Sequence, residues 1–423
     1  MSTGPGDRGT PRSLGPAFAN LFTANLASSL GDGIARTAMP LLAARLTHDP
    51  LAIAILSAMA LLPWLLFAIP AGIIVDAVDR RRALAVADGV RALLALALCA
   101  LTATGSLTIG WLFTVIFVYG TLETVYDGAA RAVVPSVVAK ANLPRANSRI
   151  EAGELVVQTF LSGPFTSVLF AVSVLIPLGV NAAAFALAAV LAVLLPRVAS
   201  GRQFARPASE EKVPWRRQFL DGLRFIWANR MLRTLWLFST FTGFWISAAT
   251  ATLVLFALDR LAVPEALFGV FMLTGAVGGL LGTAVTAPLA KRLGAGRAIA
   301  LGNVLLLAGL LVMGLVPNVW VASAMWVIVT IGVTVWNVLV MSLRQAVIPG
   351  RLLGRVHGTW RTLLWGGMPL GYVVGGLLAR IDLSVPFVLG GAIGLLATVP
   401  LWRFLVSLPD PEDVDNGDEA VAA

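Results

Sequence analysis

The sequence has few of the residues that carry enzyme and metal chemistry. It contains one cysteine, Cys99, and two histidines, His48 and His357. A single cysteine excludes a disulfide framework and any site built from several thiolates. No glycine-rich phosphate loop with a lysine is present, so ATP coupling within this chain is not expected. We therefore expect no metal site, no catalytic residues and no enzyme.

Charge is scarce as well. Only 13% of the residues are charged and 58% are hydrophobic, whereas soluble domains carry about 25% charged residues. The chain therefore has too little polar material to cover a surface that faces water. This excludes a cytosolic enzyme, an extracellular domain and a disordered protein, and it makes lipid the solvent for most of the chain.

Apolar stretches long enough to cross a bilayer recur along the whole sequence. A helix needs about 20 apolar residues for the crossing, and twelve stretches bounded by charge, Pro or Gly meet this need. The predicted spans are 17–44, 51–75, 83–104, 109–131, 152–172, 176–195, 233–258, 266–289, 298–316, 319–343, 357–379 and 384–406. The sequence thus predicts an all-α membrane protein with twelve transmembrane helices.

The net charge of +9 gives the orientation. In a soluble domain such an excess would suggest nucleic acid, but in a membrane protein Lys and Arg collect in cytoplasmic loops. With the N-terminus inside, the outer loops hold only Arg45, Arg260 and Arg380. We expect a multi-pass protein of a bacterial cytoplasmic (inner) membrane with both termini cytoplasmic, and no nucleic-acid partner.

A weak internal repeat divides the chain into two pseudo-symmetric halves. The sequence AVVP at 132–135 follows the fourth span, and AVIP at 346–349 follows the tenth. Parallel six-helix repeats with a site between them near the bilayer midplane are a transporter architecture. The predicted parts are a cytoplasmic tail 1–14, a six-helix bundle 15–195, a linker 196–232 with a basic amphipathic helix, a second bundle 233–406 and an acidic disordered tail 407–423.

The loop between the second and third spans carries a recognisable motif. Residues 71–82 read AGIIVDAVDRRR, which resembles the cytoplasmic G-x-x-x-D-x-x-x-R-[RK]-R signature of the major facilitator superfamily. Gly72, Asp76, Arg80 and Arg82 match, while Asp79 stands where the family usually has glycine. The resemblance implies a conformational gate that closes the inside, although the arginines could also serve only as positive-inside anchors.

Other stretches are similar to the branch that contains macrolide-efflux proteins and the enterobactin exporter. They are SSLGDGIARTAMPLLAARLT at 28–47, ADGVRALL at 87–94, VVPSVVAKANLPRANS at 133–148, GLRFIWANRMLR at 222–233 and LRQAVIPGRLLGRV at 343–356. The resemblance covers almost the whole chain. It implies the major facilitator fold and a drug:proton antiporter that exports an amphipathic drug, macrolide-like antibiotic or siderophore.

Ionisable residues inside the predicted spans gather in the first half, and such residues are costly in a bilayer and functional by default. Three acids have an arginine one turn later on the same helix, a spacing that allows pairing. These pairs are Asp32 with Arg36, Asp88 with Arg91, and Asp127 with Arg131. We assign the last pair to the conformational gate.

Glu123 has no arginine at such a spacing. An unpaired carboxyl in an apolar environment favours its neutral, protonated form. Asp32 lies near the middle of the first span between two glycines and could leave Arg36 when the halves rock. We predict proton coupling by Glu123, Asp32 and Arg36; the alternative is a static bridge from Arg36 to Asp32 or to Glu123 that locks helices together.

Substrate contacts are expected from polar stripes that face a cavity and from deep aromatic residues. A polar stripe in lipid must face protein or water, and large aromatics could line a pocket for a bulky amphipathic ligand. The predicted substrate-binding residues are Asn25, Gln158, Phe241, Trp245, Trp336, Asn337 and Trp365. Interhelical hydrogen bonding or packing against lipid are the alternatives for each.

The sequence therefore predicts a secondary transporter that works by alternating access, with a small-molecule substrate, protons and membrane lipids as partners. It predicts a monomer with no cofactor other than the proton gradient as energy source. A lipid or lysolipid flippase, or an importer of the same fold, is the alternative within transport. A receptor or membrane-embedded enzyme is the alternative outside it, but His48 on an outer loop and His357 at an inner helix end could not meet in a catalytic site.

Overall fold

The computed structural model describes residues 14–200 and 215–414. Within these ranges the side chains of a few residues, among them Gly72 and Asp76, are not described either. Most of the predicted N-terminal tail, part of the linker and the end of the acidic tail therefore lie outside the described residues. Every regular element in the described part of the chain is helical, so the all-α prediction is confirmed.

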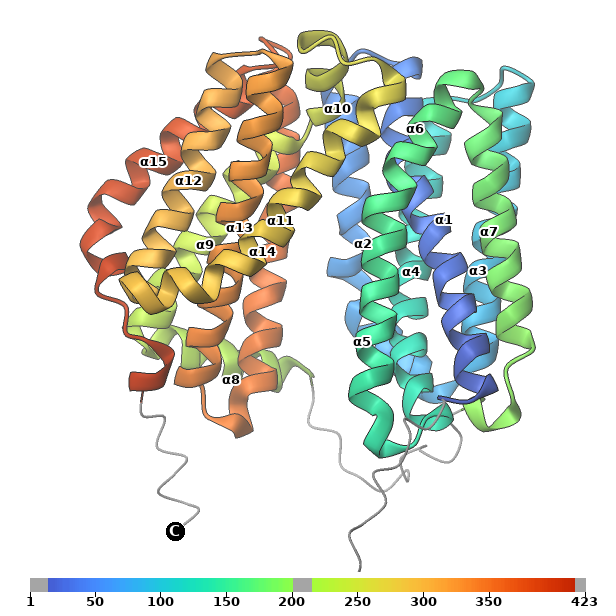
Figure 1. Cartoon of the computed structure of the whole chain (residues 1–423), viewed down its shortest axis with the longest axis horizontal. Coiled ribbons are helices and arrows are strands. Elements are labelled where there is room, and N and C mark those ends of the chain that lie inside the picture. Colours follow the sequence, from blue (N-terminus) through green and yellow to red (C-terminus); the bar gives the residue numbers. More distant parts are fainter. Residues whose placement is uncertain (1–13, 201–214, 415–423) are drawn as a thin grey trace, which may run out of the picture.

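Six helical rods form the first half of the molecule (Figure 1). Helices α5, η2 and α6 follow one another without a break, and η2 is a π-helical segment. The elements are α1 (Pro16–Leu46), α2 (Pro50–Ala77), α3 (Arg80–Ala103), α4 (Ile109–Val137), η1 (Lys140–Asn142), α5 (Leu143–Glu154), η2 (Leu155–Leu161), α6 (Ser162–Val172), α7 (Leu175–Val193) and η3 (Arg197–Ser200).

The second half repeats this plan after a short helix, α8. Its first rod bends by 45° between α9 and the segment that follows it. The elements are α8 (Trp215–Ala228), α9 (Arg230–Thr250), α10 (Leu253–Leu255), η5 (Phe256–Arg260), α11 (Glu265–Leu293), α12 (Ala295–Leu315), α13 (Val319–Val347), α14 (Gly350–Ala379), α15 (Val385–Val406) and η6 (Pro411–Asp413).

Length and composition qualify ten of the rods in the described chain as membrane spans, and an eleventh if the bent pair is counted as one. The remaining rod is α1, which carries Asn20, Asn25, Asp32 and Arg36 along its length. A span this polar must turn those side chains away from lipid and toward protein or a water-filled cavity. Helix α1 is therefore a candidate to line the functional site.

The two halves lie side by side and meet along two seams, α2 against α14 and α6 against α11. Glycine makes both approaches possible. A Cβ on Gly376 of α14 would strike Ala54 of α2, and one on Gly269 of α11 would strike the backbone of Gly163 on α6. Such contacts between small residues let membrane helices pack at backbone distance.

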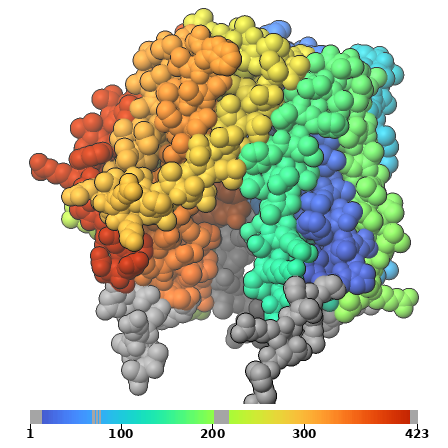
Figure 2. Space-filling view, viewed as in Figure 1, coloured from blue at the N-terminus to red at the C-terminus, as the bar shows by residue number. Residues whose placement is uncertain are grey.

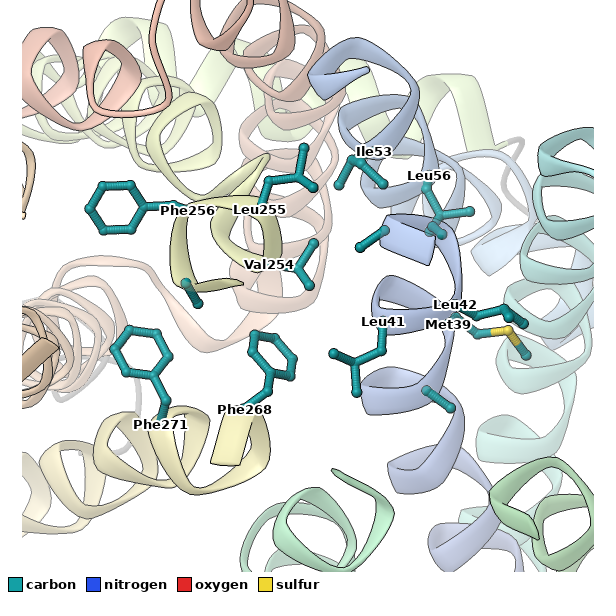
Figure 3. Packing of buried hydrophobic residues seen from close by; sticks show 14 of the residues in the cluster. Met39, Leu41, Leu42, Ile53, Leu56, Val254, Leu255, Phe256, Phe268 and Phe271 are labelled. Atoms are coloured by element: carbon teal, nitrogen blue, oxygen red, sulfur yellow. The ribbon is translucent and has the colours of Figure 1, made fainter. Parts of the chain in front are cut away.

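The ends of the seams differ. We call the end of the molecule at which α1 begins and α15 ends the termini side and the opposite end the far side (Figure 1). On the far side one apolar cluster crosses between the halves, joining Leu41 of α1 and Ile53 of α2 to Leu255 and Phe268 of the second half (Figure 3). Figure 2 shows a notch between the halves that opens toward the termini side. The structure is therefore closed on the far side.

Two ion pairs and one histidine–carboxylate contact reinforce this closure by joining residues of the two halves. Arg45 donates to Glu265 with Nε–Oε1 at 3.0 Å, and Arg380 donates to both oxygens of Asp49 at 2.8 Å. His48 Nδ1 lies 3.4 Å from Asp259 Oδ2. We refer to these contacts as the far-side latch.

Helix α8 is docked on α14. Thr359 donates to the backbone carbonyl of Phe219 at 3.1 Å, and Arg355 pairs with Asp221 at 3.2 Å. Leu220 and Trp227 on the same helix remain exposed. Helix α8 is thus attached to α14 by two polar contacts and keeps apolar side chains exposed, which is the arrangement of a helix suited to a membrane surface.

Candidate functional site

A buried cluster of charges lies inside the first half. Arg91 of α3 has no exposed side-chain surface and donates to Asp32 of α1, with Nη1–Oδ1 at 2.8 Å. Its Nη2 also lies 3.2 Å from Asp88 Oδ1, one turn earlier on α3. The predicted pair of Asp88 with Arg91 is therefore present, but Arg91 serves Asp32 as well.

Aromatic and polar side chains enclose this cluster. The Arg91 guanidinium lies over the rings of Phe185, at 4.8 Å from the centroid, and Tyr126, at 5.0 Å. Ser28 of α1 donates to Asp88 Oδ1 at 3.0 Å, whereas Asp88 Oδ2 is buried without a hydrogen-bond partner. Two carboxyls thus share one guanidinium away from water, and such a cluster is well suited to hold a proton on the second carboxyl.

Arg36 and Glu123 form a second pair beside the first. Arg36 Nη2 on α1 lies 2.9 Å from Glu123 Oε1 on α4. The side chain of Arg36 is 62% exposed although it lies inside a span, so it faces the space between the halves rather than packed protein. This ion pair is the part of the site that a substrate or a proton can reach.

These contacts correct the predicted pairing of the acids. The prediction that Asp32 pairs with Arg36 is wrong, because Asp32 binds Arg91 and Arg36 binds Glu123. Glu123 has no arginine at helix spacing on α4, but it pairs with Arg36 of α1, which is the bridge expected from the sequence as an alternative. Helix spacing revealed only partners on the same helix, whereas both pairs cross between helices. No direct ion pair joins Asp127 to Arg131 in the described part of the chain, although both lie on α4 as expected.

The predicted polar substrate residues fall in different surroundings. Asn25 is buried and donates to Glu154 Oε1 at 2.8 Å, which ties α1 to α5. Gln158 lies in the π-helical segment η2, and such segments are frequent at functional sites. Asn337 on α13 is exposed. The structure therefore does not bring these three residues into one group.

The predicted aromatic residues also separate. Trp365 of α14 packs edge-on against Trp64 of α2, with ring centroids 6.3 Å apart, at the seam between the halves. Phe241 and Trp245 contact each other on α9 at 6.5 Å. Trp336 is buried and packs against a phenylalanine of α9 inside the core of the second half, where a ligand has no access in this conformation.

The predicted gate residues are only partly described. The side chains of Gly72 and Asp76 lie outside the described residues. Arg80 donates to the carbonyl of Ala132 at 2.8 Å, which fastens the loop to α4, and Arg82 is exposed. The gate therefore stays a prediction.

Asp79, the residue that departs from the family signature, has a clear structural role. It caps α3 by accepting from the Arg81 backbone N–H at 3.0 Å and pairs with the Arg81 side chain at 3.2 Å. Partial burial opposes ionisation of Asp79, but the hydrogen bonds from Arg81 outweigh it and lower the pKa of Asp79 below its ordinary value. Asp79 thus orders the start of α3 where the family has glycine.

Two bundles of six helical rods, with a cluster of buried charges in the first, are the arrangement of a membrane transporter of the major facilitator type. The family model described as "Transmembrane secretion effector", a major facilitator family, matches residues 13–420. The chain belongs to this family, which is a class of transporters and not of enzymes. The resemblance seen in the sequence is therefore confirmed.

Known proteins agree with this assignment. The chain is 26% identical over 428 residues to the multidrug efflux pump Tap of Mycobacterium tuberculosis and Mycobacterium bovis, which covers 95% of this chain and 97% of the relative. The nucleoside transporter NupG shares the fold with a TM-score of 0.71 at 13% identity, covering 92% of this chain and 99% of its own. A bacterial homologue of the iron transporter ferroportin, in an inward-facing state, has a TM-score of 0.71 at 18% identity and covers 94% and 100%.

Proposed function

We propose that this transporter exports an amphipathic small molecule, a drug, macrolide-like antibiotic or siderophore, in exchange for protons. The observation that carries the proposal is the pair of Arg36 with Glu123, which faces the space between the halves beside the buried Arg91 cluster. The similarity to a multidrug efflux pump over almost the whole chain supports export of a hydrophobic compound.

The proposed cycle begins from the conformation described above. We place the protein in a bacterial inner membrane with the termini side in the cytoplasm, in agreement with the positive-inside rule. The notch between the halves then admits substrate from the cytosol or the inner leaflet. Rocking of the halves would break the far-side latch and expose the cavity to the outside, as alternating access requires.

The protons would act on the Arg36–Glu123 pair. A proton from outside binds to the Glu123 carboxylate, neutralises it and so releases Arg36. Arg36 lies one turn from Asp32 on α1 and can turn toward that carboxylate, which draws on the shared guanidinium of Arg91. Loss of the ion pair alters the cavity wall and favours return to the inward state, where the proton leaves to the cytosol. The loop of Gly72 to Arg82, with Asp127 and Arg131, would hold the inside shut during the outward phase.

Transport by purified protein in proteoliposomes under an imposed pH gradient tests this proposal. We expect wild type to move a hydrophobic dye or drug against its gradient, and Glu123→Gln to lose at least about tenfold of the gradient-driven rate because the variant cannot exchange the proton. Asp32→Asn is expected to lose coupling as well. Glu151→Gln is the matched control, because Glu151 is an exposed acid on α5.

Two results would contradict the proposal. If Glu123→Gln and Asp32→Asn both keep the full gradient-driven rate, these acids do not carry the proton. If no hydrophobic drug or siderophore moves but a labelled lysolipid does, the protein is a flippase.

A further inference from the structure

A cluster of cationic side chains in the second half has no role in the proton cycle. Arg344 lies in the last turn of α13, and its residue surface is only 7% exposed. Its Nη2 forms a short hydrogen bond with His357 Nδ1 on α14, and its Nε is buried with no hydrogen-bond partner. Arg361 lies one turn further along α14 and is exposed.

The guanidinium groups of Arg344 and Arg361 contact the faces of aromatic rings, where carboxylates would be the usual partners. Arg344 lies over the ring of Trp360 at 4.5 Å, and Arg361 lies over Trp365 at 3.9 Å and over Trp64 of the other half at 5.8 Å. Cation–π contacts of this kind orient a cation without neutralising its charge. The cluster therefore keeps its positive charge.

No carboxylate among the described residues contacts the cluster. Of the described acids that follow α8 in the chain, Asp259 and Glu265 lie in the far-side latch and Asp410 accepts a hydrogen bond at the start of α12. Asp382 bonds to Ser384, and Glu412 and Asp413 of η6 form no ion pair with the cluster in the described part of the chain. Asp127 and Arg131 of α4 both interact electrostatically with Arg361, and the repulsion from Arg131 is the larger of the two effects. A buried cation without a counter-ion is costly in a membrane protein and marks a functional site.

Anchoring at the membrane surface does not account for Arg344. An arginine that serves only as an anchor extends its guanidinium to water, whereas Arg344 is enclosed between α13 and α14. The C-terminal end of α13 offers it about half an elementary negative charge, and no acid among the described residues supplies the rest. Arg361 lies well inside α14 and has no such helix end beside it.

The hydrogen bond to His357 adds a donor to the cluster. Arginine has only N–H donors, so His357 Nδ1 must accept, and the neutral ring then carries its proton on Nε2. The cluster therefore presents N–H donors of two arginines and one histidine, with tryptophan faces beside them. Donors without acceptors, next to aromatic surface, fit an acidic group attached to an apolar ring system.

From this geometry we infer that Arg344, His357 and Arg361 form a subsite for the anionic group, a carboxylate, sulfonate or phosphate, of an amphiphile. Trp64 and Trp365 take its apolar part. The inference rests on the proposed export function and makes it more specific, because it predicts that the exported amphiphile carries a negative charge. Arg361 makes the first contact from the cavity, and Arg344 supplies the buried charge behind it.

Equilibrium binding of two matched fluorescent probes tests the subsite. The anion 1-anilinonaphthalene-8-sulfonate and the neutral N-phenyl-1-naphthylamine share one ring skeleton and differ in the sulfonate. With purified protein in phosphatidylcholine nanodiscs, we expect Arg361→Gln and Arg344→Gln each to weaken binding of the anion by at least about tenfold, the loss of one charge-assisted hydrogen bond. Binding of the neutral probe should stay within about twofold.

Three further variants separate charge from architecture. Arg361→Lys keeps the charge and should retain part of the preference for the anion. Arg403→Gln removes an exposed arginine at the end of α15 and should change neither affinity. Trp365→Leu should weaken both probes, because both share the ring system. Equal loss of the two probes in the arginine variants, or no loss in Arg361→Gln, would overturn the inference.

Nanodiscs that contain phosphatidylglycerol distinguish the two sources of the anionic group. If this lipid displaces the anionic probe from wild type, but does not displace the probe that still binds to Arg361→Gln, the occupant is a lipid headgroup. If it has no effect, the occupant is a free amphiphile. The measurement needs no pH gradient, so failure of proton coupling would leave its result unchanged, and its own failure would leave proton coupling intact.

Discussion

The two halves repeat one helical plan but differ in whether their buried charged groups contact groups of opposite charge. In the first half three carboxyls at the centre of the site contact arginines: Asp32 and Asp88 share Arg91, and Glu123 binds Arg36. In the second half Arg344 is buried against aromatic rings, and no described acid contacts it. The same scaffold thus holds a network of three carboxyls and two arginines in its first half, and a buried arginine that no described acid contacts in its second half.

The difference separates two tasks of a coupled transporter. A network of carboxyls and arginines can gain or lose a proton and rearrange its own pairs, so it responds to the gradient. A fixed cation without a counter-ion cannot be switched by a proton in this way, but it can recognise an anion that arrives from outside the protein. The first half is therefore suited to energy coupling and the second to recognition.

The largest expected effect comes from removing Arg91 from the charge network of the first half. Arg91→Gln leaves Asp32 and Asp88 buried without their cation, and removal of one partner from a buried ion pair typically costs about 3–5 kcal/mol. We expect a strongly lowered midpoint of thermal unfolding in detergent. The double variant Arg91→Gln with Asp88→Asn should recover part of the loss, because one buried acid then needs no charge.

The variant Arg344→Gln tests the contrast between the two halves most directly. Loss of a buried cation that has no acidic partner should cost less stability than Arg91→Gln, and in the absence of an anionic ligand it should even be tolerated. If the two variants are equally destabilised, Arg344 has a partner of its own, and the contrast between the halves is wrong.

The sequence predicted the number and positions of the helical rods because apolar length and bounding charges are local properties of the chain. It located the buried charges in the first half for the same reason. It failed on their partners: the bonds of Asp32 to Arg91 and of Arg36 to Glu123 join different helices, and no spacing within one helix encodes the rotation of a neighbour. Trp336 shows the same limit, since depth along a span does not tell which face of the helix turns into the core.

The seam between α6 and α11 joins the two halves through glycine. A change there is expected to have the next largest effect on stability. A methyl group in Gly269→Ala would collide with the backbone of Gly163, so α6 and α11 must move apart. Overpacking of this kind costs about 1–3 kcal/mol, here at the expense of the far-side-closed conformation. Gly179→Ala is the control, because a Cβ there meets nothing within 4 Å.

A single reporter cysteine measures this shift. Thr37 is buried on α1 beside this seam, and Thr37→Cys in a Cys99→Ser background leaves one thiol in the chain. We expect a membrane-impermeant maleimide applied from the far side to label it faster in Gly269→Ala than in Gly179→Ala. Equal rates would mean that the seam does not control closure and that the halves are held together elsewhere.

The smallest effect is expected at the far-side latch, where the charges are exposed and water screens them. The hydrogen bonds from Arg380 lower the pKa of Asp49 below its ordinary value. The attraction is therefore fully present above the usual aspartate pKa of about 3.9, and it is lost only as the pH falls through the lowered value. Closure by this pair should thus be independent of pH between about 5 and 8.

Asp49→Asn should raise the labelling rate of the Thr37→Cys reporter by about twofold at low salt and less at high salt. Asp382→Asn, which removes an acid bonded only within its own turn, should not. A change of the wild-type rate with pH in that window would assign the pH response of the far side to a group other than Asp49, within the latch or outside it.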